Sequence, residues 1–204
     1  MTAQIRVRDM KLAEVKIVVK IHLKSFPNFF LTSLGPAFLS ELFTATIADP
    51  DGIGLVAELN AQPVGYVIGT VNPNGFYVRL ARRRWLQFCL ASLPALLKKP
   101  LIFRRLLRAL SISNKKLPAA DCATLMSICT DPDYQGRGTG KSLTQAFLAK
   151  AFSCGAGSVN LTTDAVNNDN VNQFYRSMGF KLIRTFLTPE GRSMNEYWVQ
   201  FGPK

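Results

Sequence analysis

The sequence predicts a single mixed α/β domain, and three observations support this prediction. The chain has 204 residues, a usual length for one domain. Hydrophobic residues make up 48% of the chain and charged residues 19%, which is enough apolar material for a core and too much for a disordered chain. Apolar residues alternate in some segments and recur at helical spacing in others, and a strand–glycine loop–helix unit lies near the centre.

The first 71 residues are expected to form a strand, two helices and a hairpin. Strand segments alternate apolar and polar residues, whereas helical segments carry an apolar stripe at helical spacing. Prolines and glycines separate the segments. In chain order the expected elements are a strand around 5–7, helices over 10–24 and from the break at 35–36 to about 48, and strands over 54–59 and 64–71.

The chain from residue 122 onward is expected to alternate strands and helices and to end in a hairpin. The expected elements are a strand over 122–130, a helix over about 138–152, a strand over 159–163, a helix over 170–178 and hairpin strands over 181–187 and 194–201. Gly179 follows the short helix where a left-handed residue often ends a helix.

Positive charge is concentrated in residues 72–120. The chain has 25 Lys and Arg against 13 Asp and Glu, a net charge of +12, and this segment holds eleven basic residues and no acid. Two helical stretches are expected in it, 76–97 and 100–111; the second has an apolar face opposite a basic face of Arg104, Arg105 and Arg108. The other basic residues are Arg79, Arg82, Arg83, Arg84, Lys98, Lys99, Lys115 and Lys116.

The cysteines show neither a metal-binding nor a disulfide spacing. Cys122 and Cys129 lie seven residues apart in one predicted strand, so their side chains should point to opposite faces. With one histidine in the chain, a zinc site is not expected. We expect reduced, mostly buried thiols at all four positions, Cys89, Cys122, Cys129 and Cys154. The absence of a signal-peptide pattern and of a 20-residue apolar run favours a cytoplasmic location.

A glycine-rich loop precedes the helix expected over 138–152. A Walker phosphate loop is excluded because Gln135 stands where its first glycine must be, and the dinucleotide fingerprint is excluded because Lys141 replaces its last glycine. Glycines let successive amides converge on one point, and the N-terminus of the following helix adds its positive dipole. With Arg137 and Lys141 beside it, the loop suits a pyrophosphate; the alternative is a glycine-rich turn with no ligand. The glycines are Gly136, Gly138 and Gly140.

Two motifs resemble the signatures of the GNAT acyltransferase superfamily, which binds acetyl-CoA. The first is ICTDPDYQGRGTG, residues 128–140, and the second is NNDNVNQFYRSMGFK, residues 167–181. In the second motif, Tyr175 follows Asn168 by seven residues and precedes Gly179-Phe180, as in the family's pattern.

The resemblance implies a GNAT-type fold over a single domain, residues 1–204. That fold is a mixed, mostly antiparallel central sheet flanked by helices. Residues 6–71 and 123–204 are compatible with it, and the basic segment at about 72–120 would be a helical insertion outside the common core.

The resemblance also implies roles for individual residues. Backbone groups of Ile128, Cys129 and Thr130 would pair with the pantetheine arm as an added strand. Asn168 would bind the cofactor or fix the local turn. Tyr175 would protonate the leaving thiolate as general acid, unless it only packs the last helix onto the sheet. The residues that would hold the pyrophosphate are Gln135, Gly136, Arg137, Gly138, Thr139, Gly140 and Lys141.

The sequence does not assign a general base. Many relatives place a Glu on the strand before the glycine loop, but residues 122–130 contain none. Glu58, Asp164 and His22 are candidates, and each has a structural alternative: a strand-end charge, a cap of the following turn and a solvent-facing position, respectively. A water relay would need no dedicated base.

The expected function is transfer of an acetyl group from acetyl-CoA to a primary amine of a small molecule, without a metal. The basic segment could bind an anionic acceptor such as a nucleotide-linked or lipid-linked amino sugar, rest on an anionic membrane, or be only a solvated face. Nucleic acid is disfavoured because no groove-reading motif is present. A homodimer is compatible with the sequence. The alternative function is a non-catalytic basic binding or membrane-docking module on a GNAT-like fold.

Overall fold

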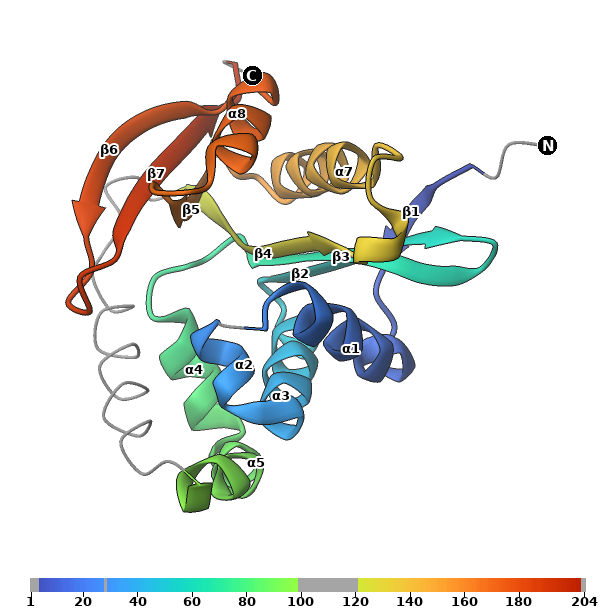
Figure 1. The fold of residues 1–204 in the computed structure, drawn as a ribbon, viewed down its shortest axis with the longest axis vertical. Helices are drawn as coiled ribbons and strands as arrows, with labels where there is room; N and C mark the ends of the chain where they lie inside the picture. Colours follow the sequence, from blue (N-terminus) through green and yellow to red (C-terminus); the bar gives the residue numbers. More distant parts are fainter. Residues whose placement is uncertain (1–3, 28, 99–120, 203–204) are drawn as a thin grey trace.

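A seven-stranded sheet organises residues 4–27, 29–98 and 121–202, which are the residues that the computed structural model describes (Figure 1). The strands lie in the order β1-β2-β3-β4-β5-β7-β6. Every neighbouring pair is antiparallel except β4 and β5, which run parallel. The predicted mixed, mostly antiparallel sheet flanked by helices is confirmed.

The N-terminal elements follow the predicted order. They are β1 (Arg6–Asp9), a 3₁₀ turn (Leu12–Glu14), α1 (Val15–Ser25), α2 (Phe30–Ser33), α3 (Gly35–Ala48), β2 (Gly52–Leu59) and β3 (Gln62–Thr70). The first helix begins at Val15 rather than at residue 10, because the Glu14 carboxylate turns back and accepts the Lys11 amide at 2.8 Å. The same carboxylate accepts Arg8 Nη1 at 2.9 Å, which ties the start of α1 to β1.

The first half of the basic segment forms two helices, α4 (Phe76–Arg83) and α5 (Trp85–Lys98), rather than the single helix expected over 76–97. Arg84 lies between them outside the helical region, with φ −132° and ψ 36°, and its guanidinium binds Glu41 of α3. The second predicted stretch, 100–111, with its basic face, lies outside the described residues. No helix within the described ranges is both long and apolar enough to cross a bilayer.

The C-terminal elements lie within one or two residues of their predicted bounds. They are β4 (Cys122–Thr130), a 3₁₀ turn (Pro132–Tyr134), α7 (Thr139–Ser153), β5 (Ser158–Asp164), α8 (Asp169–Ser177), β6 (Lys181–Leu187) and β7 (Ser193–Gln200). Gly179 has φ +87°, the left-handed conformation expected after the last helix.

Two apolar cores lie on the two faces of the sheet. Helices α1, α3 and α4 cover one face, around Phe43, Tyr66 and Phe76, and α7 and α8 cover the other, around Phe147 and Tyr197 (Figure 1). All five side chains are fully buried. The sheet is therefore packed on both faces, and the loops at its edges rest on a rigid support.

The parallel strands β4 and β5 pair over only their first residues. The ladder joins Cys122, Ala123 and Thr124 to Ser158, Val159 and Asn160. Beyond Thr124, the edge of β4 that faces β5 has no ladder partner in the described chain, although β4 continues to Thr130. This part of β4 keeps its backbone groups available for an added strand.

A β-bulge lies on β4 just beyond that point. Ile68 of β3 faces Ser127 but Gly69 faces Leu125, so Met126 is one extra residue on β4. Leu125 and Ile128 accordingly pack on the α7 side, whereas Met126 and Cys129 pack on the α1 side.

Two expectations about the cysteines are wrong, and the bulge explains the first. Because it adds one residue between Cys122 and Cys129, the odd offset no longer sends their side chains to opposite faces. Both are free thiols, the first buried and the second partly buried, but Cys89 and Cys154 are exposed, so the expectation of mostly buried thiols is wrong for these two.

Candidate active site

The glycine loop adopts a backbone that side chains disfavour. Gly136 and Gly138 have φ +76° and +78°, in the left-handed region. A Cβ at either residue would meet no atom within 4 Å. Backbone conformation rather than lack of space therefore calls for glycine here, and the loop faces open volume.

The donors of this loop have no acceptor among the residues that the structure describes. α7 begins at Thr139, so the amides of its first turn have no preceding helical turn whose carbonyls could accept their hydrogen bonds. Across the described ranges, no residue accepts a hydrogen bond from the amides of residues 136–141, and the first bond at this helix end runs from the Ser142 amide to the Gly138 carbonyl. The Thr139 hydroxyl is buried without a partner in the described structure. The loop amides are available to an anion.

The loop forms one wall of a cavity of about 440 Å³, and α8 forms another. Of the twelve residues predicted to bind the cofactor, seven line it. The guanidinium of Arg137 instead lies over the Tyr134 ring, 5.7 Å from its centroid. Unpaired amides, a helix N-terminus and a lysine are groups that hold phosphates, so the cavity fits a pyrophosphate. The lining residues are Thr130, Gln135, Gly136, Gly138, Thr139, Gly140, Lys141, Phe174, Ser177 and Met178.

The three predicted strand residues lie on the open part of β4. Ile128, Cys129 and Thr130 face Val67, Tyr66 and Gly65 of β3 on one side. On the other side they have no ladder partner among the described strands. Thr130 also lines the cavity, so the open strand edge leads directly to the glycine loop.

Tyr175 lies on α8 beside the cavity lining rather than within it. Its ring packs against Phe174, Phe180 and Tyr197, with centroids 5.3, 5.7 and 6.1 Å away, and the residue is 6% exposed. Burial raises the pKa of the Tyr175 hydroxyl above its usual range, which keeps the phenol protonated at neutral pH. The residue is thus part of the core and retains the proton that an acid needs.

Asn168 holds the turn between β5 and α8. Its side-chain amide donates to Thr163 Oγ1 at 2.8 Å and to the Asp164 backbone carbonyl at 3.0 Å. The backbone carbonyl of Asn168 accepts a hydrogen bond from the Asn172 side-chain amide at 2.8 Å. Both amide hydrogens are engaged within the turn, so the side-chain oxygen is the atom left for a ligand.

Two of the three candidate bases are bound by arginines. Glu58 Oε2 accepts Arg8 Nε at 2.8 Å. Both oxygens of Asp164 accept Arg192 Nη2 at 2.7 Å. A carboxylate held in this way would have to give up its ion pair in order to take a proton from an amine.

The third candidate, His22, is buried rather than solvent-facing. It is 1% exposed, its Nδ1 lies 2.6 Å from the Tyr66 hydroxyl, and that hydroxyl lies 2.8 Å from Ser127 Oγ. Burial lowers the pKa of His22 to about 4. The signal for this position was present in the sequence, because His22 continues the apolar stripe of Val15, Val18 and Val19 at helical spacing.

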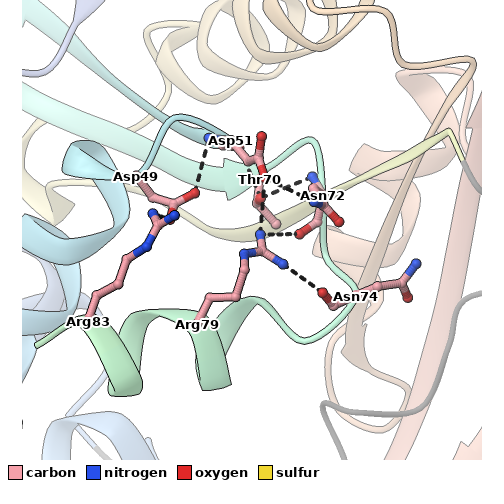
Figure 2. A network of polar contacts seen from close by, with 7 residues as sticks. All are labelled: Asp49, Asp51, Thr70, Asn72, Asn74, Arg79 and Arg83. Atoms are coloured by element: carbon pink, nitrogen blue, oxygen red, sulfur yellow. Dashed lines mark hydrogen bonds and ion pairs between the residues drawn. The ribbon is translucent and has the colours of Figure 1, made fainter. Parts of the chain in front are cut away.

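The arginines at the start of the basic segment are ion-paired within the fold. Arg79 Nη2 donates to Asp51 Oδ2 at 3.2 Å, and the guanidinium also donates to the backbone carbonyls of Asn72 and Asn74 (Figure 2). Arg83 Nη1 donates to Asp49 Oδ2 at 2.7 Å. With Arg84 on Glu41, three of the eleven basic residues are offset by acids outside the segment.

Comparisons with known protein sequences point to one family. The model of the Acetyltransferase (GNAT) family matches residues 16–180. A stretch of 69 residues is 34% identical to a Glycine max protein named histone acetyltransferase TAP1. That alignment covers 34% of this chain and 26% of the relative, so the match spans about a quarter of the relative's length.

Solved structures share the fold over nearly the whole chain. An N-acetyltransferase from Staphylococcus aureus Mu50 has a TM-score of 0.64 at 14% identity, covering 97% of this chain and 99% of that one. A polyamine N-acetyltransferase from Drosophila melanogaster has a TM-score of 0.61 at 15% identity, with coverage of 97% and 100%. The Salmonella typhimurium protein yncA, solved with its cofactor acetyl-CoA, has a TM-score of 0.61 at 13% identity, with coverage of 96% and 93%.

Proposed function

The chain belongs to the GNAT acetyltransferase family, and from this premise we propose that it transfers the acetyl group of acetyl-CoA to a primary amine of a small molecule. One observation carries the proposal: the glycine loop, the N-terminus of α7 and Lys141 surround a cavity with amide donors that no described residue uses. A phosphate-bearing acyl donor supplies the acceptor atoms that these donors require.

The chain's own residues divide the work of such a transfer. Acetyl-CoA, when bound, supplies a thioester carbonyl that a neutral amine can attack directly. The loop amides and Lys141 would hold the pyrophosphate, and the open edge of β4 from Ile128 to Thr130 would pair with the pantetheine arm. Tyr175 would give its proton to the leaving sulfur.

The charge of the basic segment supports an anionic acceptor, such as a nucleotide-linked or lipid-linked amino sugar. Within the described residues, three of its arginines, Arg79, Arg83 and Arg84, are ion-paired with acids. Arg82 is exposed, and Lys99, Arg104, Arg105, Arg108, Lys115 and Lys116 lie outside the described residues. A positive surface beside the acceptor would raise the local concentration of an anionic amine.

An acceptor panel with a thiol readout tests this proposal. Purified protein and acetyl-CoA are mixed with nucleotide-linked amino sugars, neutral amino sugars, amino acids, polyamines or peptide amines, and released CoA thiol is measured. We expect turnover with an amine, highest with an anionic one and weakened by salt through screening over about 8–10 Å. If acetyl-CoA binds but no amine raises thiol release, the chain is the non-catalytic module instead.

A specific feature of α5 supports membrane docking as a second role. It carries five large apolar side chains that are 49–84% exposed, and at 100° per residue they fall within one continuous arc. The segment around them contains no acid, so the partner that suits both features is a bilayer with anionic lipids. These residues are Trp85, Leu86, Leu90, Leu93 and Leu97.

Co-sedimentation with lipid vesicles tests the docking role. We expect binding to vesicles that contain phosphatidylglycerol, weaker binding to pure phosphatidylcholine, and loss of binding in the double variant Leu90→Gln, Leu93→Gln. No binding to anionic vesicles would overturn the proposal. A dimer of the wild-type chain that the same double variant dissociates would also overturn it, because a second copy would then cover the face.

A cytoplasmic location and a homodimer stay predictions.

A further inference from the structure

Three side chains from α1, β3 and β4 form one hydrogen-bonded chain. The Nδ1 atom of His22 lies 2.6 Å from the Tyr66 hydroxyl, which lies 2.8 Å from Ser127 Oγ. His22 and Tyr66 are 1% and 0% exposed, whereas Ser127 is only partly buried. The chain therefore runs from the core outward to a hydroxyl.

Packing alone does not account for the imidazole. Its second nitrogen, Nε2, is buried with no hydrogen-bond partner in the described structure. A buried polar atom left unsatisfied costs about 1–3 kcal/mol. Ser127 already satisfies the Tyr66 hydroxyl, and the rings around His22 are those of Phe26 and Phe43, so an aliphatic residue would be the stabilising choice.

The outer end of the chain lies on the part of β4 predicted to hold the acyl donor. Ser127 follows the bulge at Met126, which turns two consecutive side chains toward the α1 side. It also lies beyond Thr124, where β4 and β5 stop pairing, and immediately before Ile128, the first residue of the predicted pantetheine-binding edge.

We propose that His22, Tyr66 and Ser127 form a proton relay that removes the proton from the acceptor amine. This proposal rests on the proposed acetyl transfer and supplies the base that the sequence did not assign. It does not require either arginine-bound carboxylate to leave its ion pair.

The proton movements balance. The amine nitrogen forms a bond to the acetyl carbonyl carbon, and the bond between that carbon and sulfur breaks. The amine proton passes to Ser127 Oγ, the Ser127 proton to the Tyr66 oxygen, and the Tyr66 proton to His22 Nδ1. The sulfur takes the Tyr175 proton, which yields an amide and a thiol. After the product leaves, the His22 proton returns through Tyr66 to Ser127, which is only partly buried, and passes to solvent there, while Tyr175 takes up a proton from solvent.

The charge state of His22 suits this role. Its pKa of about 4 resembles that of a glutamate, so the imidazole is unprotonated at neutral pH. The titratable groups next to this hydrogen-bonded series are Tyr66 itself and Cys129 beside it. Burial raises the pKa of the Cys129 thiol to about 12. Neither is charged at neutral pH, so the three side chains start neutral.

Four variants test the relay, assayed with the wild type for kcat, KM and acetyl-CoA affinity. Ser127→Ala and Tyr66→Phe each interrupt the hydrogen-bonded relay. We expect kcat to fall at least tenfold in each variant while the acetyl-CoA Kd stays within twofold. Ser127→Thr keeps the hydroxyl and should retain the rate. His22→Asn keeps a hydrogen-bond acceptor near Nδ1 but takes no proton, so it should lose kcat like Tyr66→Phe and show a smaller solvent deuterium isotope effect than the wild type.

The outcomes separate the relay from the proposed function. Wild-type turnover with an unchanged kcat in Ser127→Ala and Tyr66→Phe overturns the relay and leaves acetyl transfer standing. A wild-type rate in His22→Asn overturns it as well, because Ser127 would then act only by position. If His22→Asn does not fold, Tyr66→Phe provides the test, because it interrupts the same relay while the side chain keeps nearly the same shape. No turnover by the wild type with any amine overturns both proposals.

Discussion

The glycine loop and the start of the basic segment both present positive groups, yet they use them differently. The loop amides of residues 136–141 have no acceptor within the described chain and line a cavity. Arg79, Arg83 and Arg84 instead bind acids contributed by α3 and by the turn that follows it. The comparison teaches that net charge in a sequence does not locate a binding site, whereas donors without a protein partner do.

The arginine network also explains how α4 stays attached to the body of the fold. Asp49 is nearly buried and accepts both Arg83 and the Asp51 amide, at 2.7 and 3.0 Å. Arg79 reaches across to Asp51 and the Asn74 carbonyl (Figure 2). We infer that these arginines are structural, so the proposed anion binding would involve other basic residues of the segment.

The largest effect on catalysis is expected at Tyr175, which lies beside the cavity that the glycine loop lines. Tyr175→Phe should leave acetyl-CoA binding near normal and lower turnover by roughly 10- to 1000-fold, because one proton donor is lost. Steady-state kinetics together with calorimetric binding measure the two effects separately. Unchanged turnover with a lower free energy of unfolding would make Tyr175 a packing residue only.

The arginine side predicts the opposite pattern, a loss of stability without a loss of binding. Arg83→Ala leaves the buried Asp49 carboxylate without its ion-pair partner, so the free energy of unfolding should fall by about 1–3 kcal/mol. The neighbouring Arg82→Ala, at an exposed position, is the matched control and should stay within about 0.5 kcal/mol. Denaturant titration measures both. Weaker acetyl-CoA binding in Arg83→Ala would contradict the structural role.

Local signals in the sequence predicted most elements and the loop. The strands and helices around the site lie within a few residues of their predicted bounds, because period and punctuation are local properties. The contacts that correct the predictions are not local. Asp49 lies 34 residues from Arg83, and His22 lies 44 residues from Tyr66. Pairing over such distances depends on how helices pack on the sheet, which one sequence does not specify.

The bulge on β4 had no readable signal either. Residues 122–130 read as a continuous apolar strand, and the extra residue Met126 appears only when β4 is laid against β3. For the same reason the sequence did not place Ser127 on the α1 side with Tyr66. The break at Arg84 was also missed, since its partner Glu41 belongs to a different helix.

The buried histidine predicts a dependence of stability on pH. An unfolded chain binds a proton on His22 near pH 6.5, but the folded protein resists it until about pH 4, so the unfolded state binds more protons in between. Stability should therefore decrease as the pH falls through this window, by about 2 kcal/mol between pH 6.5 and 5. His22→Asn should remove this slope. If stability depends on pH equally in the wild type and in the variant, His22 is not a buried, uncharged side chain in the folded protein.

The loop itself is tested by a side chain at a left-handed glycine. Gly138→Val should raise the acetyl-CoA dissociation constant at least tenfold, about 1.4 kcal/mol, because the new side chain strains the backbone and projects into the open volume. Gly155→Val is the control, since Gly155 also has a positive φ, +91°, with no atom near its Cβ, but does not line the cavity. Equal affinities in two folded variants would contradict a binding role for the loop.

We expect the glycine-loop amides, from which no described residue accepts a hydrogen bond, to hold the pyrophosphate of the acyl donor. Calorimetric titration of the wild type with acetyl-CoA and with acetyl-pantetheine, which lacks the pyrophosphate together with the 3′-phosphoadenosine, measures what this half of the donor contributes, and the same titrations of Gly138→Val assign that contribution to the loop. We expect acetyl-CoA to bind at least tenfold more tightly, a difference of at least about 1.4 kcal/mol. Equal affinity of the wild type for the two compounds would show that the loop does not hold a pyrophosphate.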